Sequence, residues 1–155
     1  MIKKRKYTLS QQETSYYCMP AVIQAILRRH GREESQDNIA TEIKCDPKEG
    51  SGFGKLLHTF LAKRKFSLQA YCYNEVLFKE PEILVAGALE RKLDLFVACP
   101  TRPERGHITL AVAYRAPTLY VLDPKDSDVA SVDLEKLYEK MWEHKFGGFG
   151  IIGKL

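Results

Sequence analysis

Apolar positions in the first third of the chain follow the spacing of an amphipathic helix. One predicted helical face consists of Met19, Val22, Ile23, Ile26, Leu27 and His30, which stand at i, i+3, i+4, i+7, i+8 and i+11. Pro20 suits a first turn, because a proline there loses no hydrogen bond. Gly31 suits the position just after a last turn. The pattern therefore predicts a helix that begins close to Cys18 and ends before Gly31.

Three more segments before residue 95 have helical patterns, and one alternates like a strand. The predicted helices run from Ser35 to about Ile43, from about Gly54 to Arg64, and from Pro81 to near Lys92, with Ser35 and Pro81 as start signals. Residues 46–52 are rich in turn formers and predict a loop. Alternation from Phe66 to Tyr73 predicts a strand.

The second half of the chain is dominated by strand-like runs. Residues 95–99, 107–114 and 119–123 are rich in β-branched and aromatic side chains. Asp133 can cap a helix that turns Trp142 inward, and the glycine-rich residues 147–152 suit a final strand. The order predicts one α+β domain over residues 1–155, with an N-terminal helical half packed on a C-terminal antiparallel sheet.

Composition and charge exclude several classes of function. A chain of 155 residues with 45% hydrophobic residues and a net charge of +4 is typical of a globular domain. The basic run at residues 3–6 predicts a solvated arm, and no aromatic-interleaved basic stripe follows, so we expect no nucleic-acid partner. No apolar run reaches the ~18 residues of a membrane span. The polar start lacks the apolar region of a secretion signal, which favours a cytoplasmic location or export without such a signal.

The cysteines raise the question of chemistry. The chain has four, at positions 18, 45, 72 and 99, and no CxxC pair, so we expect neither a metal nor a cofactor. Cys18 stands where unpaired N–H groups and the positive end of a helix dipole would stabilise a thiolate. It can also be a small buried hydrophobe, the usual place of an unpaired cysteine. The other three lie in apolar runs or at a helix end and are predicted to be inert.

A thiolate nucleophile needs a partner that holds and later delivers a proton, and histidine is the usual one. His30 is twelve residues beyond Cys18, which is ~18 Å along the predicted helix, so it is eliminated. His58 and His144 lie in amphipathic helices and are interpreted as surface or core-edge residues. His107 begins a strand with two largely apolar faces, which predicts a central place in the sheet. His107 is therefore the candidate base.

Two aspartates compete as the partner of His107. A four-residue hairpin loop after the strand at 107–114 would place Asp126 directly opposite His107. Local propensity leaves that register open. We favour Asp123, because Pro124 ends the strand there and a strand end holds a side chain more firmly than a loop does.

The order of these residues resembles that of a known family. With Gln12 six residues before Cys18, the sequence is similar to the papain-like double-glycine leader peptidases, the bacteriocin-processing cysteine peptidases that are often fused to export transporters. The segments that carry the resemblance are residues 12–31, 35–43, 106–114, 121–124 and 142–152. It implies a papain-like fold and cleavage of a peptide or protein amide bond through a thioester. It also implies four roles: Cys18 as nucleophile, His107 as general base and acid, Asp123 as the residue that orients His107, and Gln12 as side-chain donor of the oxyanion hole.

Two departures from the family pattern leave alternatives open. Met19 stands where the family usually has glycine, and a bulky side chain there could narrow the approach to the site. The sequence shows no fused transporter, so it does not indicate which substrate is cleaved. The same Cys-His-Asp order serves transglutaminases, deamidases and amide-forming acyltransferases. A third hypothesis is a catalytically silent peptide-binding or toxin-neutralising module, in which Met19 blocks productive binding.

Overall fold

The computed structural model describes residues 7–48, 54–102 and 105–155. The predicted basic arm at residues 3–6 and part of the predicted loop at 46–52 lie outside these ranges. The α-helices are α1 (Cys18–Arg29), α2 (Gln36–Glu42), α3 (Lys55–Lys63), α4 (Pro81–Glu90) and α5 (Leu134–His144). Two short 3₁₀ helices, η1 (Tyr73–Glu75) and η2 (Leu77–Lys79), precede α4. Among the described residues, no helix has both the length and the apolar character needed to cross a membrane.

The strands in the described ranges form one six-stranded antiparallel sheet in the order β1-β6-β2-β3-β4-β5. They are β1 (Phe66–Cys72), β2 (Asp94–Arg102), β3 (Arg105–Arg115), β4 (Thr118–Leu122), β5 (Val129–Asp133) and β6 (Gly148–Lys154). The strand that carries His107, β3, has a hydrogen-bonded neighbour on each side, as its two apolar faces predicted.

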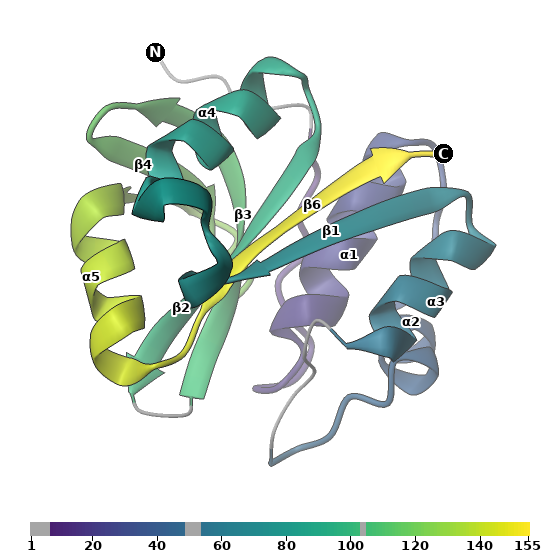
Figure 1. The fold of residues 1–155 in the computed structure, drawn as a ribbon. Coiled ribbons are helices and arrows are strands. Elements are labelled where there is room, and N and C mark those ends of the chain that lie inside the picture. The colour runs from purple at the N-terminus through teal and green to yellow at the C-terminus, as the bar shows by residue number, and fades with distance from the viewer. Residues whose placement is uncertain (1–6, 49–53, 103–104) are drawn as a thin grey trace.

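Helices cover both faces of this sheet (Figure 1). Along β2, Phe96 and Ala98 join the core under α1, α2 and α3, whereas Leu95 and Val97 join the core under α4 and α5. This follows from the two-residue repeat of a strand, which sends successive side chains to opposite faces. The predicted α+β class is confirmed, with α4 and α5 added on the face opposite the N-terminal helices.

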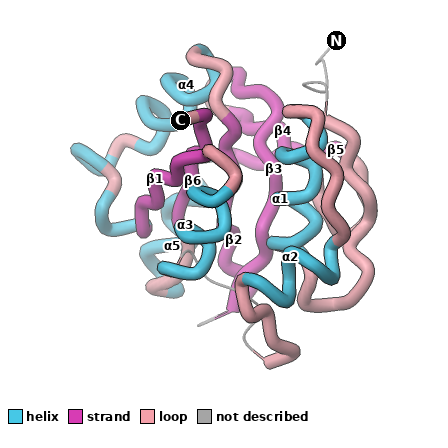
Figure 2. Tube along the Cα trace, turned by 90° about the vertical axis from the view of Figure 1, so that its right-hand side faces the viewer, coloured by secondary structure: helices cyan, strands magenta, loops and turns pink. Residues whose placement is uncertain are grey.

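Helix α1 is buried more completely than its predicted apolar face required. All nine residues from Met19 to Leu27 are buried, because the helix packs against α2 as well as against β3, over which it lies in Figure 2. Gln24, on the predicted polar side, is only 6% exposed. A buried glutamine needs hydrogen-bond partners, and those partners lie next to the candidate site.

Three sequence-based expectations were wrong. The edge strand β5 was missed, because its first three residues, 129–131, are all exposed and show no apolar alternation. Trp142 is 39% exposed and packs its ring edge-on against Tyr73 instead of entering the core. The β3–β4 hairpin has a two-residue turn between the paired Arg115 and Thr118, not a four-residue loop, and an irregularity in the pairing between Ala111 and Ala113 shifts the register beyond it.

Candidate active site

Cys18 is the first residue of α1. Its N-terminal neighbour Tyr17 provides no side-chain cap, and the first backbone N–H that bonds back is that of Ala21, to the Tyr17 carbonyl at 3.0 Å. The N–H groups of Cys18 and Met19 have no acceptor inside the helix. Cys18 as a residue is partly exposed. Cys18 therefore combines access to solvent with the positive end of a helix dipole, which favours a thiolate.

His107 and Asp123 meet where β3 begins and β4 ends. Leu110 pairs with Leu122, so Asp123 follows directly on a paired residue. The Nε2 atom of His107 lies 2.5 Å from Oδ1 of Asp123, and both side chains are about three-quarters buried. The same oxygen accepts the backbone N–H of Lys125 at 2.9 Å, and the Asp123 carbonyl accepts that of Ser127 at 2.7 Å. The turn after β4 thus holds the carboxylate in a fixed position against the imidazole.

The protonation of His107 reflects two opposing effects. Burial by itself lowers the pKa of His107, but hydrogen bonds to the Cys18 sulfur and to the Asp123 carboxylate outweigh it, so that the pKa of His107 is raised to about 9. Because Asp123 engages Nε2, Nδ1 is the ring nitrogen left to face the thiol. At neutral pH the imidazole therefore carries a proton, and it stands against the sulfur of Cys18.

Gln12 lies in the loop before α1 and is tied to the same end of the sheet. Its backbone N–H donates to the Pro124 carbonyl at 2.7 Å, one residue beyond Asp123. Its side-chain amide donates to the Thr14 carbonyl at 2.8 Å, and because an amide NH₂ carries two hydrogens, one remains for another acceptor. The Gln12 Oε1 atom is buried with no hydrogen-bond partner among the described residues. This atom is an acceptor, so it does not by itself indicate a donor role toward substrate.

The histidines set aside in the sequence lie elsewhere. His30, the residue that follows α1, has Nε2 2.9 Å from Oδ2 of Asp94. That carboxylate is 1% exposed and also pairs with Arg29 at 2.6 Å. His58 is exposed on α3 and His144 is the last residue of α5. The structure brings Cys18, His107 and Asp123 together in one chain of contacts.

The other three cysteines are in settings that disfavour a thiolate. Burial is the main cause that raises the pKa of Cys99, to about 11, and burial followed by a hydrogen bond with Glu75 raises that of Cys72. The thiol of Cys45 donates to the Tyr16 carbonyl at 3.2 Å. Cys72 is the N-cap of the short helix η1, but burial and Glu75 still raise its pKa. The predicted inertness of the three cysteines is consistent with these surroundings.

Met19 does not reach the approach to Cys18. Its side chain is 1% exposed and belongs to the core between α1, α3 and the sheet. The expectation that a bulky residue here narrows the site is therefore wrong, because the second position of α1 points into the interior. The hypothesis of a catalytically silent module therefore loses the steric block by Met19 on which it rested.

We expect Met19→Ala to act on stability and leave substrate binding unchanged. Truncation of a fully buried methionine removes core contacts and leaves a cavity, which lowers the free energy of unfolding by ~2–5 kcal/mol. Urea unfolding measures that loss, and KM at a temperature well below unfolding should match the wild type. A lower KM or faster turnover without loss of stability would show that Met19 obstructs the site after all.

We expect Asp123→Ala to impair turnover far more than Asp126→Ala does. Loss of a hydrogen bond to a charged group costs about 1.5–3 kcal/mol, which corresponds to roughly ten- to a hundredfold in rate. The side chain of Asp126 is exposed and accepts the backbone N–H of Asp128 at 2.9 Å. Asp123→Asn keeps an acceptor oxygen for His107 and should retain more activity than Asp123→Ala. Equal kinetics for the two alanine variants would contradict the role of Asp123.

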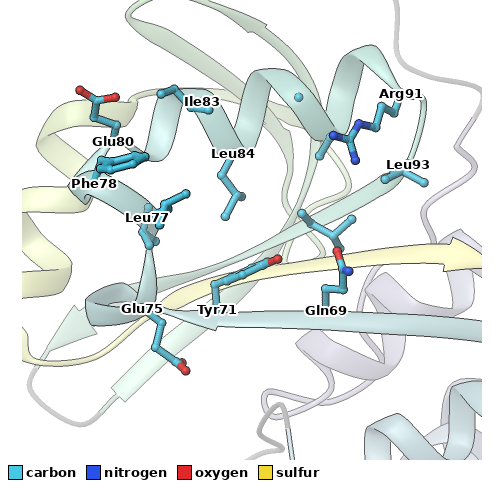
Figure 3. A pocket seen from close by; sticks show the side chains of 14 residues that line it. Gln69, Tyr71, Glu75, Leu77, Phe78, Glu80, Ile83, Leu84, Arg91 and Leu93 are labelled. Atoms are coloured by element: carbon cyan, nitrogen blue, oxygen red, sulfur yellow. The ribbon is translucent and has the colours of Figure 1, made fainter.

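An apolar cavity lies apart from these groups. It has a volume of about 470 Å³ and lies between α4, η2, β1 and β6 (Figure 3). Tyr71, Leu77, Phe78, Ile83 and Leu84 are among its lining residues. Gln12, Cys18, His107 and Asp123 are not, so the cavity and the candidate active site are separate features.

Comparison with known proteins places the fold. No family model and no curated protein matches the sequence. Solved structures do match, among them three that cover nearly the whole chain. The peptidase domain of Streptococcus ComA, a bifunctional ABC transporter of a quorum-sensing pathway, is 17% identical, with a TM-score of 0.68 over 96% of this chain and 99% of that one.

The other two are similar in the same way. A double-glycine motif protease from an AMS/PCAT transporter, in complex with the leader peptide, is 13% identical, with a TM-score of 0.66 over 96% of this chain and 91% of that one. A putative C39-like peptidase from Bacillus anthracis is 14% identical, with a TM-score of 0.67 over 99% and 98%. The fold implied by the sequence resemblance is thereby confirmed, and the chain has the α+β, papain-like fold of the double-glycine peptidase domains.

Proposed function

We propose that this chain is a cysteine peptidase that cleaves peptide or protein amide bonds through a thioester on Cys18. The observation that carries the proposal is the chain of contacts from Asp123 through His107 to Cys18 at the start of a buried helix. A weak nucleophile is activated when it is hydrogen-bonded to a base that a third group holds in orientation.

The steps follow from the protons that these groups hold. The Cys18 thiolate attacks the carbonyl carbon, and negative charge forms on the carbonyl oxygen, where the Cys18 N–H and the Gln12 amide would donate. The C–N bond then breaks as His107 delivers its proton to the leaving amine, which leaves an acyl thioester. Water, deprotonated by His107, attacks the thioester, and the acid product leaves with the thiolate–imidazolium pair restored. Asp123 keeps the imidazole aligned throughout.

The comparisons suggest which substrates to try first. One similar structure is a double-glycine motif protease bound to a leader peptide, and another is a peptidase domain. Peptides that carry a Gly-Gly pair before the cleaved bond are therefore the first candidates for this chain.

Covalent labelling tests the proposal. The protein is treated with a peptidyl-glycinal or an epoxide inhibitor of cysteine peptidases, and the modified residue is mapped by mass spectrometry, with Cys18→Ala as control. We expect the label on Cys18 and two cleavage products from a Gly-Gly peptide. A single deamidated product, or transfer of the acyl group to an added amine in place of water, would assign another acyl-transfer reaction. An unlabelled Cys18 would overturn the proposal.

A further inference from the structure

A buried side-chain amide stands directly behind the loop that carries Gln12. Gln36, the first residue of α2, is 1% exposed. Its Oε1 accepts the backbone N–H of Glu13 at 2.9 Å, and its Nε2 donates to the backbone carbonyl of Gln11 at 3.1 Å. Burial of a polar amide is costly unless its groups are paired, and these two bonds go to the residues on either side of Gln12.

These bonds hold the Gln12 backbone from two sides. In an extended segment, the C=O of one residue and the N–H two residues later lie on one side, and the N–H between them points to the other. On one side, Gln36 bonds to the Gln11 carbonyl and the Glu13 N–H. On the other side, the Pro124 carbonyl accepts the Gln12 N–H at 2.7 Å. The side chain of Gln12 therefore leaves a backbone that is fixed on both edges.

The brace, by which we mean Gln36 with its hydrogen bonds to Gln11 and Glu13, is also hydrogen-bonded to the helix of the candidate nucleophile. Gln36 Nε2 donates to Oε1 of Gln24 on α1 at 3.2 Å, and Gln24 Nε2 donates to the Glu34 carbonyl at 2.9 Å. Gln24 itself is 6% exposed. Two buried amides thus connect the loop of Gln12, the helix that begins with Cys18, and α2 in one hydrogen-bonded network, which low local dielectric strengthens.

We propose that Gln36 is a positioning residue for the oxyanion donor Gln12, an inference that rests on the proposed peptidase function. A donor stabilises the transition state only when it is already aimed at the place where charge develops. Displacement of a catalytic group by about 1 Å can cost on the order of a hundredfold in rate. Gln36 acts through the backbone of Gln11 and Glu13 and does not touch the substrate.

Kinetics of Gln36→Met test this role. Methionine has a similar length without hydrogen-bonding groups, so the loop loses its brace while the volume is kept. We expect kcat on a Gly-Gly peptide to fall by about ten- to a hundredfold with KM little changed, and the iodoacetamide reaction of Cys18, which forms no oxyanion, to stay at the wild-type rate. In a Gln12→Ala background, Gln36→Met should cause no further fall in kcat, because the group it positions is gone.

Two further measurements separate the possible failures. Ile39→Val, a core change on the same helix, controls for loss of stability in α2 and should leave kcat unchanged. Hydrogen exchange in the wild type, which needs no variant to fold, should show a protected Glu13 amide although that side chain is exposed. A rapidly exchanging Glu13 amide, or unchanged kcat in Gln36→Met with an active Cys18, would overturn the brace. An inert Cys18 and an uncleaved peptide in the wild type would instead overturn the proposed function and, with it, any catalytic role for Gln36.

Discussion

Replacement of His107 by glutamine is expected to lower kcat/KM for a cleaved peptide by about 10²–10⁴, the usual contribution of a positioned acid–base group. Glutamine keeps much of the size of imidazole and can still bond to Asp123, but it neither holds nor delivers a proton. The hydrogen bond of His107 to the Cys18 sulfur is among the contacts that raise the pKa of His107 to about 9. Loss of that positive charge should also slow the reaction of Cys18 with iodoacetamide near neutral pH.

The matched control is His58→Gln. His58 is exposed on α3, so its replacement should leave both rates unchanged. If the His107→Gln variant turned over substrate at the wild-type rate, the imidazole would not activate the thiol. An undiminished rate of Cys18 alkylation in that variant would show the same. The pH dependence adds a second check: since His107 is protonated below about pH 9, its role as acid should persist through neutral pH and be lost above about pH 9.

Replacement of Gln12 by alanine is expected to slow turnover by about 10²–10³, the cost of one oxyanion-hole donor. In the tetrahedral intermediate the former carbonyl oxygen is negative, and the backbone N–H of Cys18 alone would remain to stabilise it. Alkylation of Cys18 involves no such oxygen, so its rate should survive in Gln12→Ala. Steady-state kinetics and alkylation of the same preparation measure the two effects side by side.

Gln11→Ala is the control for this change. The Gln11 side chain is exposed, and its backbone carbonyl, which bonds to Gln36, is kept in the variant. We therefore expect near wild-type turnover. Equal losses in both variants would indicate that the loop is merely structural, and a normal rate in Gln12→Ala would remove the oxyanion-hole assignment.

Local signals predicted the elements of the fold because most of them are themselves local. Ser35 and Asp133 were expected to cap helices, and their side chains accept the N–H groups of Asn38 and Lys136. Elements without such signals were missed: β5 lies at the sheet edge and is exposed at its first three positions, so no apolar alternation shows it. Trp142 was wrongly expected in the core because the sequence pattern shows which side of a helix is apolar but not where the edge of the buried surface lies.

How far the sequence predicted the position of a site residue differed from one residue to the next. The start of α1 at Cys18 follows from its apolar pattern, and the neighbourhood of His107 and Asp123 follows from an antiparallel hairpin. Their actual register depends on the two-residue turn and the irregular pairing near Val112, which propensity does not determine. The buried Gln36 was not recognised, because a glutamine that opens a helix looks like a surface residue until its tertiary partners are known. The catalytic roles of the four residues stay predictions.

The central claim is that Cys18 is an activated thiolate, and competitive alkylation tests it most directly. The native protein is treated with limiting iodoacetamide at pH 6, and the modified cysteines are quantified by peptide mass spectrometry. Cys18 should be modified well before Cys45, Cys72 and Cys99, because it alone combines a helix N-terminus with contact to His107. Equal rates at the four cysteines would contradict the account.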